Sequence, residues 1–124
     1  MDYCVIDTSS IIFGASSRKD AFSIARSTFQ GTEAVISTGI LHELEGMANN
    51  KGKKGADART SLEMIKNGRV RIIRNDSYPD TWIRNIAARY KNAIVITNDT
   101  ALFNQIRKTG GKAFKLSRSG ILKR

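Results

Sequence analysis

Short apolar runs alternate along the chain with longer segments in which apolar residues recur every three or four positions. The short runs predict buried strands, and the longer segments predict helices that bury one face. An alternation of the two is typical of an α/β domain with a parallel sheet. Strands are predicted at residues 3–7, 34–37, 69–74, 93–97 and 112–116.

The charge pattern within these runs predicts which strands lie at the centre of the sheet. The runs around Val5 and Val95 are continuously apolar, which is typical of strands buried on both faces. The runs at 69–74 and 112–116 carry Lys or Arg between their apolar residues, as edge strands often do. We therefore expect a five-stranded parallel sheet with these last two strands at its edges.

Helices are predicted where the apolar residues form a stripe. These segments are 40–48, 56–67, 82–90 and 100–109, together with parts of 11–30 on either side of a break near 14–17. Ser77 and Pro79 are suited to begin the 82–90 helix, as a capping residue and a first-turn proline. The stretch NNKGKKG (49–55) predicts a flexible loop. We see no repeat or dividing linker, so we expect one domain, residues 1–124.

Composition limits the class of protein. A hydrophobic content of 40% and a single proline predict a folded chain. No run approaches the ~18 apolar residues that a membrane span needs. The start of the chain lacks the basic-then-apolar pattern of an export signal, and the one cysteine, Cys4, lies in an apolar run. We expect a cytoplasmic protein, not bound to a membrane, in which Cys4 is buried and reduced.

The net charge of +10, from 21 Lys and Arg against 11 Asp and Glu, suggests a partner. No acid follows Asp99, whereas seven basic residues do: Arg107, Lys108, Lys112, Lys115, Arg118, Lys123 and Arg124. Runs of charge often only solvate a surface, but clustered positive charge also attracts phosphate backbones. The balance favours a nucleic-acid partner.

Carboxylates are the reactive groups that the chain offers, because one histidine, His42, and one cysteine give no basis for a zinc site. Asp7 closes the first predicted strand, and Asp99 follows the fourth. Functional sites of open parallel sheets lie beyond the carboxyl ends of the strands, where the strand order switches. If these two strands are neighbours, a hard cation such as Mg²⁺ or Mn²⁺ could lie between the two carboxylates. Either aspartate alone could instead cap the helix that follows it.

Helical geometry does not decide whether three further acids belong to the site. Glu43 and Glu45 flank the apolar stripe of 40–48 on opposite sides, so periodicity does not decide which faces the sheet edge. Asp80 falls in the first turn of its helix, where a carboxylate stabilises the helix dipole for structural reasons alone.

Four fragments together resemble the PIN-domain family of metal-dependent ribonucleases: VIDTSSII (5–12), ILHELEGM (40–47), PDTWIRNIA (79–87) and AIVITNDTAL (93–102). The resemblance implies a three-layer α/β/α fold with sheet order 3-2-1-4-5. It implies that Asp7, Glu43, Asp80 and Asp99 are the catalytic residues and the ligands of Mg²⁺ or Mn²⁺. It thereby selects Glu43, without deciding whether Glu45 assists. Ser9 and Thr97 match polar positions that support these ligands.

The activity that the resemblance implies is hydrolysis of RNA by a metal-activated water. Basic residues would attract RNA without reading its sequence, with Arg84, Arg107 and Lys108 as candidates. Within the family, a toxin role with an antitoxin partner and a role in rRNA processing both stay open, and homodimers are frequent. The alternative function is a non-catalytic RNA-binding module on the same fold. A phosphate-accepting receiver domain fits less well, because Asp76 lies beyond the third strand without an apolar lead-in.

Overall fold

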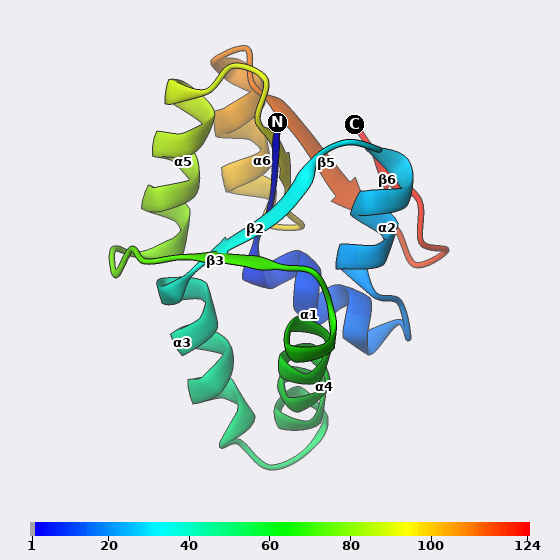
Figure 1. Cartoon of the computed structure of the whole chain (residues 1–124). Helices are drawn as coiled ribbons and strands as arrows, with labels where there is room; N and C mark the ends of the chain where they lie inside the picture. Colours follow the sequence, from blue (N-terminus) through cyan, green and yellow to red (C-terminus); the bar gives the residue numbers. More distant parts are fainter. Residues whose placement is uncertain (1) are drawn as a thin grey trace.

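One sheet of six strands forms the centre of the computed structural model, which describes residues 2–124 (Figure 1). The strand order is β3-β2-β1-β4-β5-β6. The first five strands in this order are parallel, and β6 pairs antiparallel to β5. The strands are β1 (Tyr3–Ile6), β2 (Glu33–Ser37), β3 (Arg71–Ile73), β4 (Ile94–Ile96), β5 (Lys112–Leu116) and β6 (Leu122–Lys123). The predicted α/β class and the order 3-2-1-4-5 are confirmed.

Helices cover both faces of this sheet. They are α1 (Thr8–Ser16), α2 (Ala21–Thr28), α3 (Thr38–Ala48), α4 (Lys53–Asn67), α5 (Pro79–Arg89) and α6 (Thr100–Lys108). Figure 1 shows α5 and α6 together on one side of the strands and α2 on the other, while α3 and α4 form a pair that extends beyond the sheet. The chain runs from β1 outward to β3, returns to β4 beside β1 and continues outward to β5, and its connecting helices therefore lie on both faces.

The centre of the sheet is the most deeply buried part of the protein. Val5 pairs with Val35 on one side and with Val95 on the other, and all three are at most 1% exposed. Cys4 is fully buried beside them, and burial raises the pKa of its thiol to about 12. No helix within residues 2–124 combines the length and the apolar character that crossing a bilayer requires.

The break between the first two helices lies later than the sequence predicts. The helix α1 continues through Gly14 to Ser16, and α2 begins after Asp20, whose carboxylate accepts hydrogen bonds from the Phe22 and Ser23 N–H groups. Gly14 is needed for close packing rather than for a break, because a Cβ there would lie 2.8 Å from the Lys19 carbonyl oxygen.

Three other details differ from the prediction. Ser77 does not cap α5; its hydroxyl donates to Asn75 Oδ1 instead, and Tyr78 is the N-cap residue. The helix α4 begins at Lys53, inside the predicted loop, where a Cβ on Gly55 would overlap the Asn50 carbonyl. The two-residue strand β6 was not predicted, since so short a strand has no periodicity, and it removes β5 from the outermost position.

Candidate acidic site at the carboxyl edge of the sheet

Asp7 lies where β1 ends, and its backbone holds it against β4. The Asp7 N–H donates to the Ile96 carbonyl at 2.9 Å, while the Asp7 carbonyl accepts from the Ser10 and Ile11 N–H groups at the start of α1. The Asp7 carboxylate makes no capping hydrogen bond to α1. The side chain is 7% exposed, so the strand end presents a nearly buried carboxylate that does not serve the helix.

Two hydroxyl groups bind the same oxygen of this carboxylate. Ser9 Oγ donates to Asp7 Oδ2 at 2.7 Å, and Thr97 Oγ1 donates to the same atom at 2.8 Å. No hydrogen bond to Asp7 Oδ1 is found within residues 2–124. Burial raises the pKa of the Asp7 carboxyl, the Ser9 and Thr97 hydroxyls and the Thr8 backbone N–H oppose the rise, and the charge of Asp99 adds to it.

Asp99 is close enough for its charge to act on Asp7, and Thr97 connects the two residues. The Asp99 N–H donates to Thr97 Oγ1 at 3.1 Å. Asp99 Oδ1 accepts from the Leu102 N–H at 3.1 Å and so caps α6. Capping and a ligand role are compatible for Asp99, because the cap engages only one of its two carboxylate oxygens.

Asn98 connects three elements beside Asp7 and Asp99, although it was not among the site residues expected from the sequence. Its Oδ1 accepts from Ser10 Oγ at 2.6 Å and from the Leu116 N–H at 3.1 Å, and its Nδ2 donates to the Leu116 carbonyl at 2.9 Å. Its backbone N–H donates to Ser9 Oγ at 3.0 Å. Asn98 therefore holds together the start of α1, the end of β4 and the end of β5. Its position between Thr97 and Asp99 was the only signal in the sequence.

Glu43 and Asp80 lie on helices that begin at the same edge of the sheet, since α3 follows β2 and α5 follows β3. Glu43 is exposed and forms no ion pair within the described residues. Asp80 Oδ2 lies 3.3 Å from Arg84 Nη1 in an exposed pair. Across residues 2–124, no three His, Cys, Asp or Glu side chains are grouped as a metal site would require. The structure thus brings Asp7 and Asp99 together and does not add Glu43 or Asp80 to them.

The starts of α3 and α5 are connected through the loop before α5. The Asn75 carbonyl accepts from the Gly39 N–H and from Thr38 Oγ1, each at 3.1 Å. The Asn75 N–H donates to Thr38 Oγ1 at 3.0 Å. Gly39 permits this contact, because a Cβ there would lie 2.8 Å from the Ser77 carbonyl oxygen.

An open cavity of about 540 Å³ lies along this junction. Its lining residues are Gly39, His42, Asp76, Ser77, Tyr78, Pro79 and Thr81. Tyr78 is 80% exposed, which is unusual for an aromatic ring that has an apolar face to bury. His42 immediately precedes Glu43 in the chain, and Tyr78 immediately precedes Pro79 and Asp80. The cavity therefore lies next to Glu43 and Asp80.

The three basic residues expected to bind RNA lie in two places. Arg84, on α5, donates to Asp80, Thr81 and Gln105. Arg107 and Lys108 lie in the last turn of α6, at the opposite end of the helix from Asp99. The structure therefore separates Arg107 and Lys108 from the acidic edge.

The Asp7–Asp99 pair fits a hard divalent cation in its chemistry. Both side chains offer carboxylate oxygens, and within residues 2–124 neither forms an ion pair with Lys, Arg or His. A buried carboxylate beside a second one is costly without a positive charge nearby. Mg²⁺ is often held by one or two carboxylates with water and substrate phosphate completing its shell. The pair meets that requirement without a third acid.

An open parallel sheet that changes strand order between β1 and β4, with paired carboxylates just beyond that point, defines an α/β domain with its site at the switch point. A family model described as a PIN-like domain matches residues 4–118. The chain therefore belongs to the PIN-like domain family, as the four fragments indicated.

Solved structures give the same result for the fold. The PIN domain endonuclease Utp24 is 26% identical, with a TM-score of 0.79 over 98% of this chain and 91% of that one. A domain of a functionally unknown protein from Methanocaldococcus jannaschii DSM 2661 is 21% identical, with a TM-score of 0.63 over 94% of this chain and 92% of that one. No curated protein matches the chain significantly.

Proposed function

We propose that this protein is a divalent-metal-dependent endoribonuclease that uses the Asp7–Asp99 pair. The observation that carries the proposal is the nearly buried Asp7 carboxylate, raised in pKa and next to Asp99, with no ion pair among residues 2–124 to offset the charge. Membership of the PIN-like family and the similarity to an endonuclease along nearly the whole chain support it. Bound Mg²⁺ or Mn²⁺ would supply a Lewis acid and an activated water for phosphodiester hydrolysis.

The side chains around Asp7 have distinct roles in this proposal. Ser9 and Thr97 donate hydrogen bonds to Oδ2 of Asp7, so Oδ1 of Asp7 would be the oxygen that binds the metal ion. Asp99 Oδ1 is held by the Leu102 N–H at the start of α6, so Asp99 Oδ2 would bind the same metal ion. Glu43, in the middle of α3, and Asp80, in the first turn of α5, would contribute through metal-bound water rather than by direct contact with the metal ion. These carboxylates repel RNA phosphates, so metal binding and RNA binding should be coupled.

Two features of the surface support RNA as the substrate. The net charge of +10 favours a polyanion. The Tyr78 ring is 80% exposed and lies near Glu43 and Asp80. It offers a flat aromatic face on which an unpaired base can stack. A toxin with an antitoxin partner and an rRNA-processing nuclease remain the two candidate roles, each compatible with a homodimer. An antitoxin reading frame adjacent to the gene would favour the first.

The test is an RNA cleavage assay with Mn²⁺ or Mg²⁺ and with EDTA. We expect cleavage by the wild type with metal, none in EDTA, and a loss of about 100-fold or more in Asp7→Asn and Asp99→Asn. Glu63→Gln is the matched control, because it removes an exposed carboxylate from α4, a helix that carries none of the proposed site residues. Full activity in EDTA, or equal activity in all four proteins, would contradict the proposal.

One observation favours a second candidate, a non-catalytic RNA-binding module. No third acid joins Asp7 and Asp99 within the described residues. This candidate predicts salt-sensitive RNA binding that Asp7→Asn leaves unchanged, and no cleavage with either metal. The same set of proteins, measured for binding and for cleavage, separates the two candidates.

A further inference from the structure

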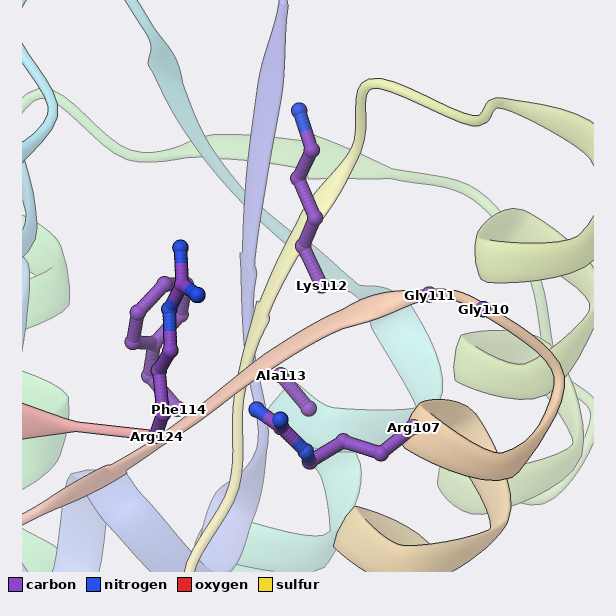
Figure 2. A pocket seen from close by; sticks show the side chains of 7 residues that line it. All are labelled: Arg107, Gly110, Gly111, Lys112, Ala113, Phe114 and Arg124. Atoms are coloured by element: carbon purple, nitrogen blue, oxygen red, sulfur yellow. The ribbon is translucent and has the colours of Figure 1, made fainter.

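A second cavity, of about 300 Å³, lies at the far end of α6 from Asp99. Its lining residues are Arg107, Gly110, Gly111, Lys112, Ala113, Phe114 and Arg124. Three of these seven residues are cationic, and none is acidic. Figure 2 shows Arg124 beside the Phe114 ring on one side of the β5 ribbon and Arg107 next to Ala113 on the other, with Lys112 extending from the start of the strand away from both. The cavity is therefore positively charged on several sides.

The turn between α6 and β5 builds this cavity. Gly110 has a φ of 85°, a value that favours glycine, and the Gly111 N–H donates to the Ile106 carbonyl at 2.9 Å. A Cβ on Gly111 would lie 2.6 Å from Ile106 Cγ2, so only glycine lets the chain turn so tightly against α6. The tight turn brings Arg107, at the end of the helix, near Lys112, at the start of the strand.

The short strand β6 leaves one edge of the cavity open, and the residue that follows it, Arg124, is the third cation. It pairs with Lys115 and Leu116 of β5, so the outer edge of Lys112 to Phe114 has no neighbouring strand in the described chain. The same register, continued by one residue, puts Arg124 opposite Phe114. The Arg124 guanidinium carbon lies 6.0 Å from the centre of the Phe114 ring.

The cationic groups are oriented but not neutralised. The Arg107 guanidinium carbon lies 5.5 Å from the centre of the Phe103 ring, and Arg124 is held by Phe114 in the same way. Within residues 2–124, Arg107, Lys112 and Arg124 form no ion pair. Their hydrogen-bond donors therefore remain available for an anion.

This cavity is separate from the acidic edge. Asp99 precedes the first residue of α6 and Arg107 is next to last in it, so about 12 Å of helix axis separates them at ~1.5 Å per residue. In addition, Asp99 follows the carboxyl end of β4, whereas Lys112 begins β5 at the opposite edge of the parallel sheet.

We propose that the Arg107–Lys112–Arg124 cavity binds a phosphate group of single-stranded RNA, as an anchor remote from the point of cleavage. Arginine forks match phosphate oxygens bidentately and a lysine adds a point charge, which suits this set of side chains. A polymer is favoured over a small phosphate compound because residues 100–124 around the cavity carry seven basic residues and no acid. The choice of RNA rests on the proposed function, whereas the phosphate chemistry rests on the cavity alone.

The test measures binding in EDTA, so that cleavage plays no part. The probes are inorganic phosphate and a short single-stranded RNA, each titrated into isotopically labelled protein while the amide signals of Gly111 and Ala113 are followed by NMR. We expect both probes to shift these signals saturably. The triple variant Arg107→Ala, Lys112→Ala, Arg124→Ala should lose the shifts and bind RNA about tenfold or more weakly. The slope of log K against log salt should fall by about 0.7 in that variant, the value expected for the loss of one phosphate contact on a single strand.

A matched control removes equal charge elsewhere. Lys66→Ala, Arg69→Ala and Lys91→Ala together delete three exposed cations away from the cavity, and we expect RNA affinity to fall much less than in the cavity variant. Equal losses in the two triple variants, or no amide shift with either probe, would overturn the proposal. Phosphate binding without RNA binding would overturn the RNA assignment and indicate a small phosphate ligand. Binding of RNA at the cavity by a protein that never cleaves would contradict the nuclease proposal and leave the anchor intact.

Discussion

Thr97 donates a hydrogen bond of 2.8 Å to Asp7 Oδ2 across the junction of β1 and β4. The same hydroxyl oxygen accepts from the Asp99 N–H at 3.1 Å. One fully buried hydroxyl therefore supports the Asp7 charge and fixes the backbone of Asp99. The two residues that we propose as metal ligands depend on it together.

Thr97→Val should move the pH dependence of metal binding upward. The substitution keeps the shape of the side chain but removes a hydrogen bond that lowers the pKa of Asp7. A higher pKa means that Asp7 loses its proton, and so gains its metal affinity, only at higher pH. Mn²⁺ titrations across a pH series would measure this. Thr97→Ser retains the hydroxyl and should resemble the wild type; identical profiles for Val and Ser would contradict the role given to Thr97.

Asp7→Asn should stabilise the metal-free protein near neutral pH. Burial raises the pKa of Asp7 above its ordinary value of 3.8, so the folded protein holds this proton more tightly than the unfolded chain does. The resulting contribution to stability is complete below pH 3.8 and is lost as the pH rises through the folded pKa. Because asparagine carries no charge, its advantage over aspartate should grow across that window and vanish below it.

Chemical unfolding in EDTA at several pH values would measure the difference. Excess Mn²⁺ should reverse the order, because it stabilises only the folded form that binds it. A wild type that is more stable than Asp7→Asn in EDTA at neutral pH would show that the buried charge is already compensated within the protein.

Gly39→Ala and Gly46→Ala, both on α3, should have opposite effects on stability. A Cβ at Gly39 would lie 2.8 Å from the Ser77 carbonyl oxygen, so alanine there should destabilise the fold by about 1–3 kcal/mol. Gly46 has nothing within 4 Å of the same Cβ, and alanine there should stabilise the helix by up to about 1 kcal/mol. Denaturant unfolding of the two variants beside the wild type would test the pair. Equal effects would mean that the contact between α3 and the loop before α5 is not tight.

Tyr78→Ala should weaken RNA binding without changing the fold, because the ring is 80% exposed. Loss of one stacked base costs about 1–3 kcal/mol, or roughly 5- to 150-fold in affinity. Tyr78→Phe keeps the aromatic face and should bind like the wild type. Tyr90→Ala removes the aromatic ring that packs at 6.1 Å against Tyr3 and serves as the control. Unchanged binding in Tyr78→Ala would remove Tyr78 from the RNA surface.

The division into central and outer strands was predictable because burial on both faces and charge near the edges leave different residue patterns. The full order 3-2-1-4-5 came from the resemblance to the PIN-domain family. The Asp7–Asp99 neighbourhood followed from that order. What the sequence did not disclose depends on contacts between distant positions. Asn98 bonds to Leu116 and Ser10 through side-chain geometry that no periodicity encodes. Ser77 has the right residue type for a cap, but a nearby acceptor on Asn75 competes for its hydroxyl.

The positions of the candidate acids relative to one another also could not be predicted from the sequence alone. Helical periodicity leaves Glu43 and Glu45 equivalent, and the structure leaves Glu43 exposed and apart from Asp7. Asp80 engages Arg84, four residues further along the same helix. The sequence marked Arg107 and Lys108 only as candidates for contacts with RNA, without placing them relative to the acidic site. Only the direction of α6 in the fold shows that they lie at the other end.

The hydrogen bonds between the start of α3 and Asn75 have a mechanical consequence. They join the supports of Glu43 and Asp80, so we expect these two acids to move as one rigid body, while Asp7 and Asp99 move with the central strands. We therefore expect the four acids of this edge to move as two groups rather than as four independent side chains. Slow amide exchange at Asn75 and Gly39, in step with each other, would be the signature of this shared motion.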